Sequence, residues 1–166
     1  LSTCVEACVE HVFRGGEHSF LGMVPLFHSL GLTATLLAPM RLAMPVTFQA
    51  RFSPVTTLQV LRETKPTIVI GIPSMFKAML LSKSAQADDF KSIYAAVCGG
   101  EALPASVREE FNSRFNVNLM EGYGLTETCG PIAVNTPEKY LAGSVGRVIP
   151  GATARVVNDE GKPVDV

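Results

Sequence analysis

The stretch richest in reactive groups is "MEGYGLTETCG", residues 120–130, which sets an aromatic ring, hydroxyls and carboxylates among glycines. Glycines let a backbone approach a ligand closely, and the ring of Tyr123 offers a stacking face worth about 1–3 kcal/mol to a nucleobase. The Thr126 hydroxyl can donate to a phosphate oxygen, and the Glu127 carboxylate can hold a cation that bridges phosphates. The pattern fits a nucleotide and metal site, and equally a half-buried loop tyrosine beside a solvated turn carboxylate.

Three further stretches combine glycine, proline, aromatic and polar residues: "PLFHSLG" (25–31), "GIPSMF" (71–76) and "GGEALP" (99–104). Gly99 and Gly100 would let the backbone lie close to a flat ligand. The imidazole of His28 can orient a bound group, although a histidine after an apolar strand is also a common hydrogen-bonded packing residue. Ser29 and Ser74 lie outside any GxSxG turn, which argues against a hydrolase.

These stretches follow short apolar runs that predict strands at 20–24, 45–49, 67–71, 94–98 and 117–121. The runs are nearly continuous in apolar character, which is typical of strands buried on both faces. Helical periodicity between them, as in Val107, Phe111 and Phe115, completes βαβ units. The sequence therefore predicts an α/β fold, with a mostly parallel β-sheet flanked by helices.

Turn and cap residues predict where other elements begin and end. A first helix is expected over Thr3–Phe13, ending at Gly15-Gly16. Ser53-Pro54 predicts a hydroxyl N-cap followed by proline at the first helical position, and Pro104 can open the helix to about Phe115. After Pro150, "TARVVNDEGKPV" predicts a C-terminal antiparallel strand or hairpin.

In an open parallel sheet, ligands bind beyond the carboxyl ends of the strands. The stretches named above all follow predicted strands. We therefore expect the loops at Phe27, Gly99 and Tyr123 to cluster at one edge of the sheet.

Composition narrows the class of protein. The chain has 166 residues, 47% of them hydrophobic, and a formal net charge of −1. This length suits one domain, and the absence of a basic run argues against nucleic-acid binding. No apolar stretch reaches the length of a membrane span, so we expect a soluble, cytoplasmic protein.

The cysteines indicate reduced thiols rather than a disulfide framework. Cys4, Cys8, Cys98 and Cys129 show neither CxxC spacing nor the density of a secreted scaffold. Cys4 and Cys8 lie one helical turn apart, which suits two metal ligands or two small residues on a buried face. No nearby His or Cys completes a tetrahedral set.

Five collinear motifs resemble those of the adenylate-forming superfamily: "PLFHSLG", "KPTIVIGIPSMF", "CGGEALP", "EGYGLTET" and "GSVGRVIPG". The superfamily includes acyl-CoA and aryl-CoA synthetases, peptide-synthetase adenylation domains and luciferases. The resemblance implies an ATP-dependent ligase that joins a carboxylate to AMP and passes the acyl group to CoA. ATP, Mg²⁺ and CoA are the implied cofactors and cosubstrates.

The resemblance assigns roles at matching positions only. It implies that Tyr123 packs on adenine, that Thr126 contacts the adenylate phosphate, and that Glu127 binds magnesium and, with Thr126 and His28, is catalytic. His28 falls beside the carboxylate-bearing end of the substrate. The implied cofactor-binding residues are Gly99, Gly100, Glu101, Gly122, Tyr123, Gly124 and Thr126.

The amino-acid sequences of the motifs resemble those of fatty acyl-CoA synthetases most, so a fatty or related carboxylic acid is the expected substrate. "PLFHSLGL" carries no aspartate that would hold an amino group. An apolar acyl channel is expected from Gly122 and Gly71 with Ile72, Pro73 and Met75, although ordinary core packing explains Met75 equally well.

The family's phosphate loop, ribose-binding aspartate and catalytic lysine have no match in residues 1–166. We therefore expect a single α/β subdomain that is a fragment of a larger N-terminal domain, with the missing segments of its own parent as partners. In isolation it is expected to be a non-catalytic nucleotide- or acyl-binding module that self-associates through uncovered apolar surface.

Overall fold

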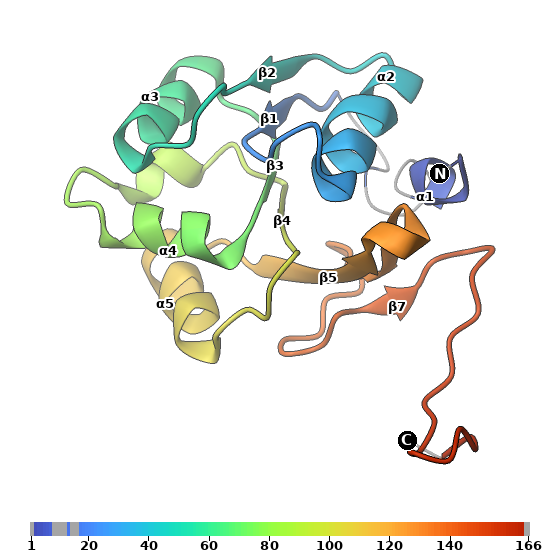
Figure 1. Ribbon diagram of the computed structural model, residues 1–166. Coiled ribbons are helices and arrows are strands. Elements are labelled where there is room, and N and C mark those ends of the chain that lie inside the picture. The colour runs from blue at the N-terminus through green and yellow to red at the C-terminus, as the bar shows by residue number, and fades with distance from the viewer. Residues whose placement is uncertain (1, 8–12, 14–16, 165–166) are drawn as a thin grey trace.

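The computed structural model describes residues 2–7, 13 and 17–164, and these form an α/β fold around a seven-stranded sheet of order β2-β1-β3-β4-β5-β6-β7 (Figure 1). The strands are β1 (Phe20–Gly22), β2 (Val46–Phe48), β3 (Ile68–Gly71), β4 (Ala95–Cys98), β5 (Leu119–Leu125), β6 (Gly130–Val134) and β7 (Arg147–Val148). The pairs from β2 to β5 are parallel, whereas β5–β6 and β6–β7 are antiparallel. The predicted mostly parallel sheet is confirmed.

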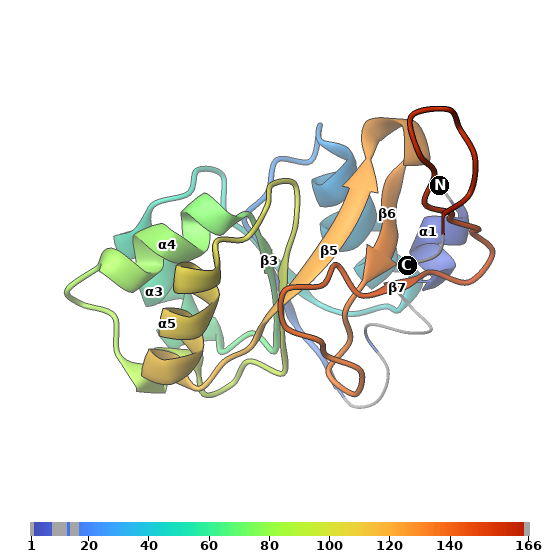
Figure 2. The ribbon, with the colours of Figure 1, turned by 90° about the horizontal axis from the view of Figure 1, so that it is seen from below.

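Helices cover both faces of the sheet (Figures 1 and 2). The α-helices are α1 (Ser2–Ala7), α2 (Ala38–Arg41), α3 (Pro54–Thr64), α4 (Pro73–Leu81) and α5 (Ala105–Phe115). A π-helix, η2 (Gly31–Leu37), precedes α2, and 3₁₀ turns occur at η3 (Ala87–Phe90) and η4 (Thr126–Thr128). Helices α3, α4 and α5 pack on one face, and α1, η2 and α2 lie against the other.

Alternation along each strand produces the two cores. Leu21, Val69 and Leu119 point toward α3, α4 and α5, where they meet the buried side chains of Leu58 and Phe111. Their neighbours along the strands form the second core, which contains Phe20, Ile68, Ile70, Val97, Met120, Cys4 and Ala34. Burial on both faces explains why these strands read as continuous apolar runs.

The local predictions have different outcomes. Ser53 has the extended backbone of an N-cap, but its hydroxyl makes no capping hydrogen bond. Helix α1 is described only to Ala7, and Cys8 and Gly15-Gly16 lie outside the described residues. The predicted C-terminal antiparallel hairpin is confirmed: Val157 and Pro163 form an antiparallel bridge, flanked by hydrogen bonds from the Asn158 N–H to the Lys162 carbonyl and from the Val164 N–H to the Val156 carbonyl.

No helix in the described part of the chain is long and apolar enough to cross a membrane.

An ion pair between the partly exposed Arg62 and the buried Asp89 joins α3 to η3. Asp89, whose side chain is 4% exposed, accepts hydrogen bonds from Arg62 at 2.7 and 2.9 Å and from the Gln86 N–H at 2.9 Å. Arg62 also donates to the Ser84 carbonyl at 2.6 Å. Burial opposes ionisation of Asp89, but the hydrogen bonds from Arg62 and Gln86 outweigh it and hold the pKa of the carboxyl below its usual value.

We expect Asp89→Asn to lower the free energy of unfolding by about 1–3 kcal/mol at pH 7, because Arg62 loses its charged acceptor. A folded-state pKa below the unfolded value means that this stabilisation is present above about pH 4 and is lost as the pH falls further. Urea unfolding at several pH values measures both effects.

Asp88→Asn is the matched control, because Asp88 pairs with Lys91 at the surface, where both side chains are about three-quarters exposed. Such a pair contributes about 0–1 kcal/mol. Equal losses of unfolding free energy in the two variants would show that the Arg62–Asp89 ion pair is not stabilising. A difference between the variants that does not depend on pH would show the same.

Candidate functional site

The site begins where β5 changes partner. Leu119 to Glu121 pair in parallel with β4, whereas Gly122 to Leu125 pair antiparallel with β6. Strand β4 ends at Cys98 and the chain turns away through Gly99 and Gly100. An opening therefore lies between the end of β4 and the outer half of β5, at the carboxyl edge of the parallel sheet.

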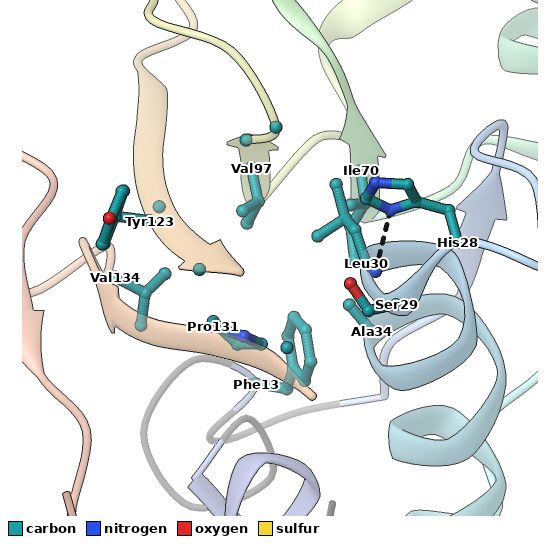
Figure 3. Close-up of a pocket in the computed structure, with 15 residues that line it drawn as sticks. Phe13, His28, Ser29, Leu30, Ala34, Ile70, Val97, Tyr123, Pro131 and Val134 are labelled. Atoms are coloured by element: carbon teal, nitrogen blue, oxygen red, sulfur yellow. Dashed lines mark hydrogen bonds between the residues drawn. The ribbon is translucent and has the colours of Figure 1, made fainter. Parts of the chain in front are cut away.

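This opening holds a cavity of about 50 Å³ (Figure 3). Its lining comes from Phe13, the His28 loop with η2, the ends of β3 and β4, the outer half of β5, and β6. The lining residues are Phe13, His28, Ser29, Leu30, Ala34, Ile70, Val97, Gly99, Gly100, Gly122, Tyr123, Gly124, Gly130, Pro131 and Val134. None of them carries a carboxylate, ammonium or guanidinium group, so the wall is apolar apart from a few hydroxyls, backbone groups and an imidazole.

His28 and Tyr123 face the cavity from opposite sides, with Val97 between them at the end of β4 (Figure 3). The Tyr123 side chain is 48% exposed, which leaves one part of the ring against the cavity rim and the other open to solvent. The three loops predicted to cluster at one edge, those of Phe27, Gly99 and Tyr123, all contribute to the cavity, the first of them through His28 and Ser29. A Cβ atom on Gly99 would lie 3.3 Å from the Gly122 carbonyl oxygen.

The ring of His28 caps the start of η2. Its Nδ1 atom accepts a hydrogen bond from the Leu30 N–H at 3.1 Å, and the backbone N–H of His28 donates to the Pro25 carbonyl oxygen at 3.1 Å. Because Nδ1 is an acceptor, the neutral ring carries its proton on Nε2, which remains able to donate to a bound oxygen. Gly31 follows directly, and a Cβ there would collide with the Pro25 carbonyl, so the tight turn requires glycine.

The turn after β5 presents Thr126 and Glu127 to solvent. Thr128 holds this turn closed, since its hydroxyl accepts from the Leu125 N–H at 2.9 Å and lies 2.8 Å from the Gly130 carbonyl oxygen. Among the described residues, Glu127 forms no ion pair or hydrogen bond. The turn therefore fixes the backbone while leaving the predicted phosphate and metal groups available to a ligand.

Glu101, predicted beside the adenine, is exposed on the loop after β4 and is not among the residues that line the cavity. Glu121 points elsewhere, because its carboxylate accepts from Arg108 at 3.3 Å, with both side chains 15% exposed. The Glu121 carbonyl accepts from the side chain of Asn135 at 3.1 Å. Arg108 and Asn135 thus anchor the point at which β5 switches partner.

The residues predicted to line an acyl channel do not all lie at this cavity. Gly122 lines the cavity, but Gly71, Ile72, Pro73 and Met75 do not. A Cβ atom on Gly71 would touch Met23 and Phe76 in the core, and Met75 lines a separate groove with the exposed Phe27. The loop after β3 turns into α4, which covers the other face of the sheet, and it carries these residues away from the cavity.

Sequence reasoning missed Phe13, Val97, Pro131 and Val134 as lining residues. Val97 could have been found, because it is near the end of a predicted strand. Pro131 and Val134 lie on β6, whose pairing with β5 no sequence pattern predicted.

A single carboxylate stands where a metal is expected. Within residues 2–7, 13 and 17–164, no group of three or more His, Cys, Asp or Glu side chains could hold a metal ion. Glu127 still fits Mg²⁺, because that ion is commonly held by one or two carboxylates together with substrate phosphates and water.

Gly124 is the position at which the site tolerates no side chain. A Cβ there would collide with the Gly130 carbonyl across the irregular β5–β6 register, whereas a Cβ on Gly122 would meet its neighbours at an ordinary 3.5 Å. We expect Gly124→Ala to lower the free energy of unfolding by about 1–3 kcal/mol. Gly122→Ala, the matched control, should change it by less than about 1 kcal/mol. Urea unfolding compares them, and similar values would contradict the close β5–β6 approach.

Proteins of known name are similar in sequence to most of this chain. The chain is 31% identical over 158 residues to a long-chain-fatty-acid–CoA ligase of Bacillus subtilis, covering 93% of this chain and 28% of that protein. It is 28% identical over 140 residues to the benzoate–CoA ligase of Thauera aromatica, covering 84% of this chain and 27% of that protein. The chain thus spans less than a third of the length of these relatives.

The fold matches solved structures over nearly all its length. The crystal structure of ATP-bound MatB from Rhodopseudomonas palustris superposes with a TM-score of 0.91 at 22% identity, covering 99% of this chain and 33% of that chain. The family model described as AMP-binding enzyme matches residues 1–166. This chain belongs to the AMP-binding enzyme family, the adenylate-forming superfamily that its motifs resemble.

Proposed function

We propose that this chain is one α/β subdomain of an acid:CoA ligase, which activates a carboxylic acid as its acyl adenylate with ATP and then transfers the acyl group to CoA. The observation that carries the proposal is the meeting of the Gly99-Gly100 turn, Tyr123 and His28 around one cavity at the carboxyl edge of the sheet. The relatives are named as CoA ligases, which supports the reaction class.

In this proposal the nucleotide lies across the rim of the cavity, between the Gly99-Gly100 backbone and the Tyr123 ring. Ligand sites usually enclose about 300–1,000 Å³, far more than the 50 Å³ found here. This cavity is therefore too small to enclose the nucleotide. The remaining contacts of the nucleotide would come from other segments of the parent enzyme.

His28 and Thr126 would contact the reacting groups. The Nε2 proton of His28 can donate to a carboxylate oxygen of the acid, which holds that group beside the α-phosphate. The Thr126 hydroxyl can donate to a phosphate oxygen from the exposed turn. Glu127 would hold Mg²⁺ at the phosphates, where the ion neutralises negative charge during adenylate formation.

The acid is proposed to have an uncharged tail. The cavity wall lacks charged side chains, and burying an unpaired charge costs several kcal/mol. Fatty and aromatic acids both satisfy this condition, and the two relatives named above act on one of each kind. Within that class we favour a fatty acid, because the motif sequences resemble those of fatty acyl-CoA synthetases.

Glu127→Gln in the intact enzyme should reduce adenylation, measured by pyrophosphate exchange, at least about tenfold, because a neutral amide binds Mg²⁺ far more weakly than a carboxylate. The thermal unfolding temperature should barely change, since Glu127 is exposed and makes no ion pair among the described residues. Glu110→Gln, at an exposed position on α5, is the matched control and should keep full activity. An unchanged exchange rate in Glu127→Gln would make this residue a solvated turn carboxylate.

A second candidate function applies to residues 1–166 alone, which we propose bind adenine nucleotides weakly without catalysing adenylation. The small cavity favours this reading. Each missing charge-assisted contact costs about 1.5–3 kcal/mol, so a micromolar site becomes millimolar or weaker. Calorimetric titration with Mg-ATP should give a millimolar dissociation constant that Tyr123→Ala weakens further. Micromolar affinity, or turnover of a fatty acid and CoA, would show that the site residues are wrongly assigned.

A further inference from the structure

Helix α1, which carries Cys4, lies beside the turn that carries Thr126 and Glu127 (Figure 1), and Cys4 contacts the residue before Cys129. Cys4 is buried on α1, and its thiol donates to the Thr128 carbonyl oxygen at 3.3 Å. Cys129 is the next residue and is exposed. Both are free thiols in the structure.

The backbone around Cys129 is held on both sides. Cys4 contacts the carbonyl of Thr128, and the buried hydroxyl of Thr33 donates to the carbonyl of Cys129 itself at 2.9 Å. Cys129 has φ of 59°, the left-handed conformation, and it ends the 3₁₀ turn η4. Two packed helices, α1 and η2, therefore fix the position of the Cys129 backbone.

The spacing of the two sulphur-bearing side chains suits a crosslink. Standard bond lengths place the Cys4 sulphur within about 6 Å of the Cys129 Cα atom. Closure of a disulfide then needs rotation of the two side chains and a shift of at most about 2 Å.

The two thiols differ in their access to solvent. Burial raises the pKa of the Cys4 thiol, and the neighbouring Cys129 raises it further, while the chain's N-terminal charge acts in the opposite direction. Exposed Cys129 therefore reacts first with a soluble oxidant, and Cys4 is the group that follows.

We propose that Cys129 and Cys4 form a redox-sensitive pair, which a small disulfide such as oxidised glutathione converts into a crosslink between α1 and the Thr126–Thr128 turn. The Cys129 thiolate attacks one glutathione sulphur, forms a mixed disulfide and releases one glutathione thiolate. The Cys4 thiolate then attacks the Cys129 sulphur and displaces the second glutathione. The chain loses two electrons and two protons, and one oxidised glutathione becomes two reduced ones.

The crosslink replaces the Cys4 S–H···O contact to Thr128 with a covalent bond to the adjacent residue, so it changes how the turn is anchored. Its effect on Thr126 and Glu127 rests on the proposed function, whereas the thiol chemistry does not. Oxidation of the two thiols thus changes the anchoring of the turn that presents Thr126 and Glu127, the proposed phosphate- and metal-binding residues.

The test incubates the purified 166-residue chain with oxidised glutathione, traps free thiols by alkylation and maps the products by mass spectrometry. A glutamate-specific protease cuts after Glu6, between Cys4 and Cys8, so the partner of Cys129 is identified directly. The Cys4–Cys129 crosslink should exceed the Cys129–glutathione adduct at least about tenfold, because the intramolecular thiol has a millimolar or higher effective concentration. Dithiothreitol should reverse it.

Two variants decide the assignment. Cys4→Ala should accumulate the glutathione adduct on Cys129, whereas Cys98→Ala should leave the crosslink unchanged, since Cys98 is buried in β4. Circular dichroism confirms that each variant is folded. A lasting adduct in the unsubstituted chain, a crosslink from Cys129 to Cys8, or no reaction at Cys129 would overturn the proposal. None of these readouts involves a nucleotide, so they stand apart from any failure of the proposed ligase function.

Discussion

The change of partner along β5 is the constraint on which the rest of the site depends. Strand β6 pairs with Gly122 to Leu125 along the edge of β5 opposite to β4, and this pairing keeps the outer half of β5 extended beyond the end of β4. Because β4 ends at Cys98, a gap lies beside this half of β5. The cavity, the exposed face of Tyr123 and the turn after Leu125 all follow from this arrangement.

Two polar side chains keep that arrangement in place. Asn135 is 1% exposed and donates to the carbonyls of Glu121 and Ser144 while accepting from the Leu141 N–H. It therefore ties the end of β6 and the following loop to the switch point on β5. Thr128 does the same for the turn at the other end of the β5–β6 pair. A buried amide with its bonds satisfied specifies one geometry, since any other would leave polar groups unpaired.

Much of this arrangement could be predicted from the sequence, for identifiable reasons. The strands were visible because burial on both faces leaves continuous apolar runs, and the edge of the site followed from the rule for parallel sheets. Strand β6 was not visible, because "GPIAV" is short, begins with glycine and proline, and becomes a strand only through its contact with β5. Met75 packs against the core, which is the alternative that the sequence left open, because its loop enters a helix on the opposite face. The roles of Tyr123, Thr126 and Glu127 stay predictions, because the structure fixes the positions of these residues and not the groups that they bind.

The most direct test of a nucleotide site at this edge is an NMR titration of the labelled 166-residue chain with AMP at concentrations that saturate a millimolar site. Our account predicts that the backbone amides of Gly99, Gly100 and the stretch from Gly122 to Thr126 shift together, with one dissociation constant. The groove of about 490 Å³ at Glu17 to Ser19 and Leu42 to Pro45, near the starts of β1 and β2, should stay unchanged. Shifts confined to that groove, or none at the carboxyl edge, would contradict the account.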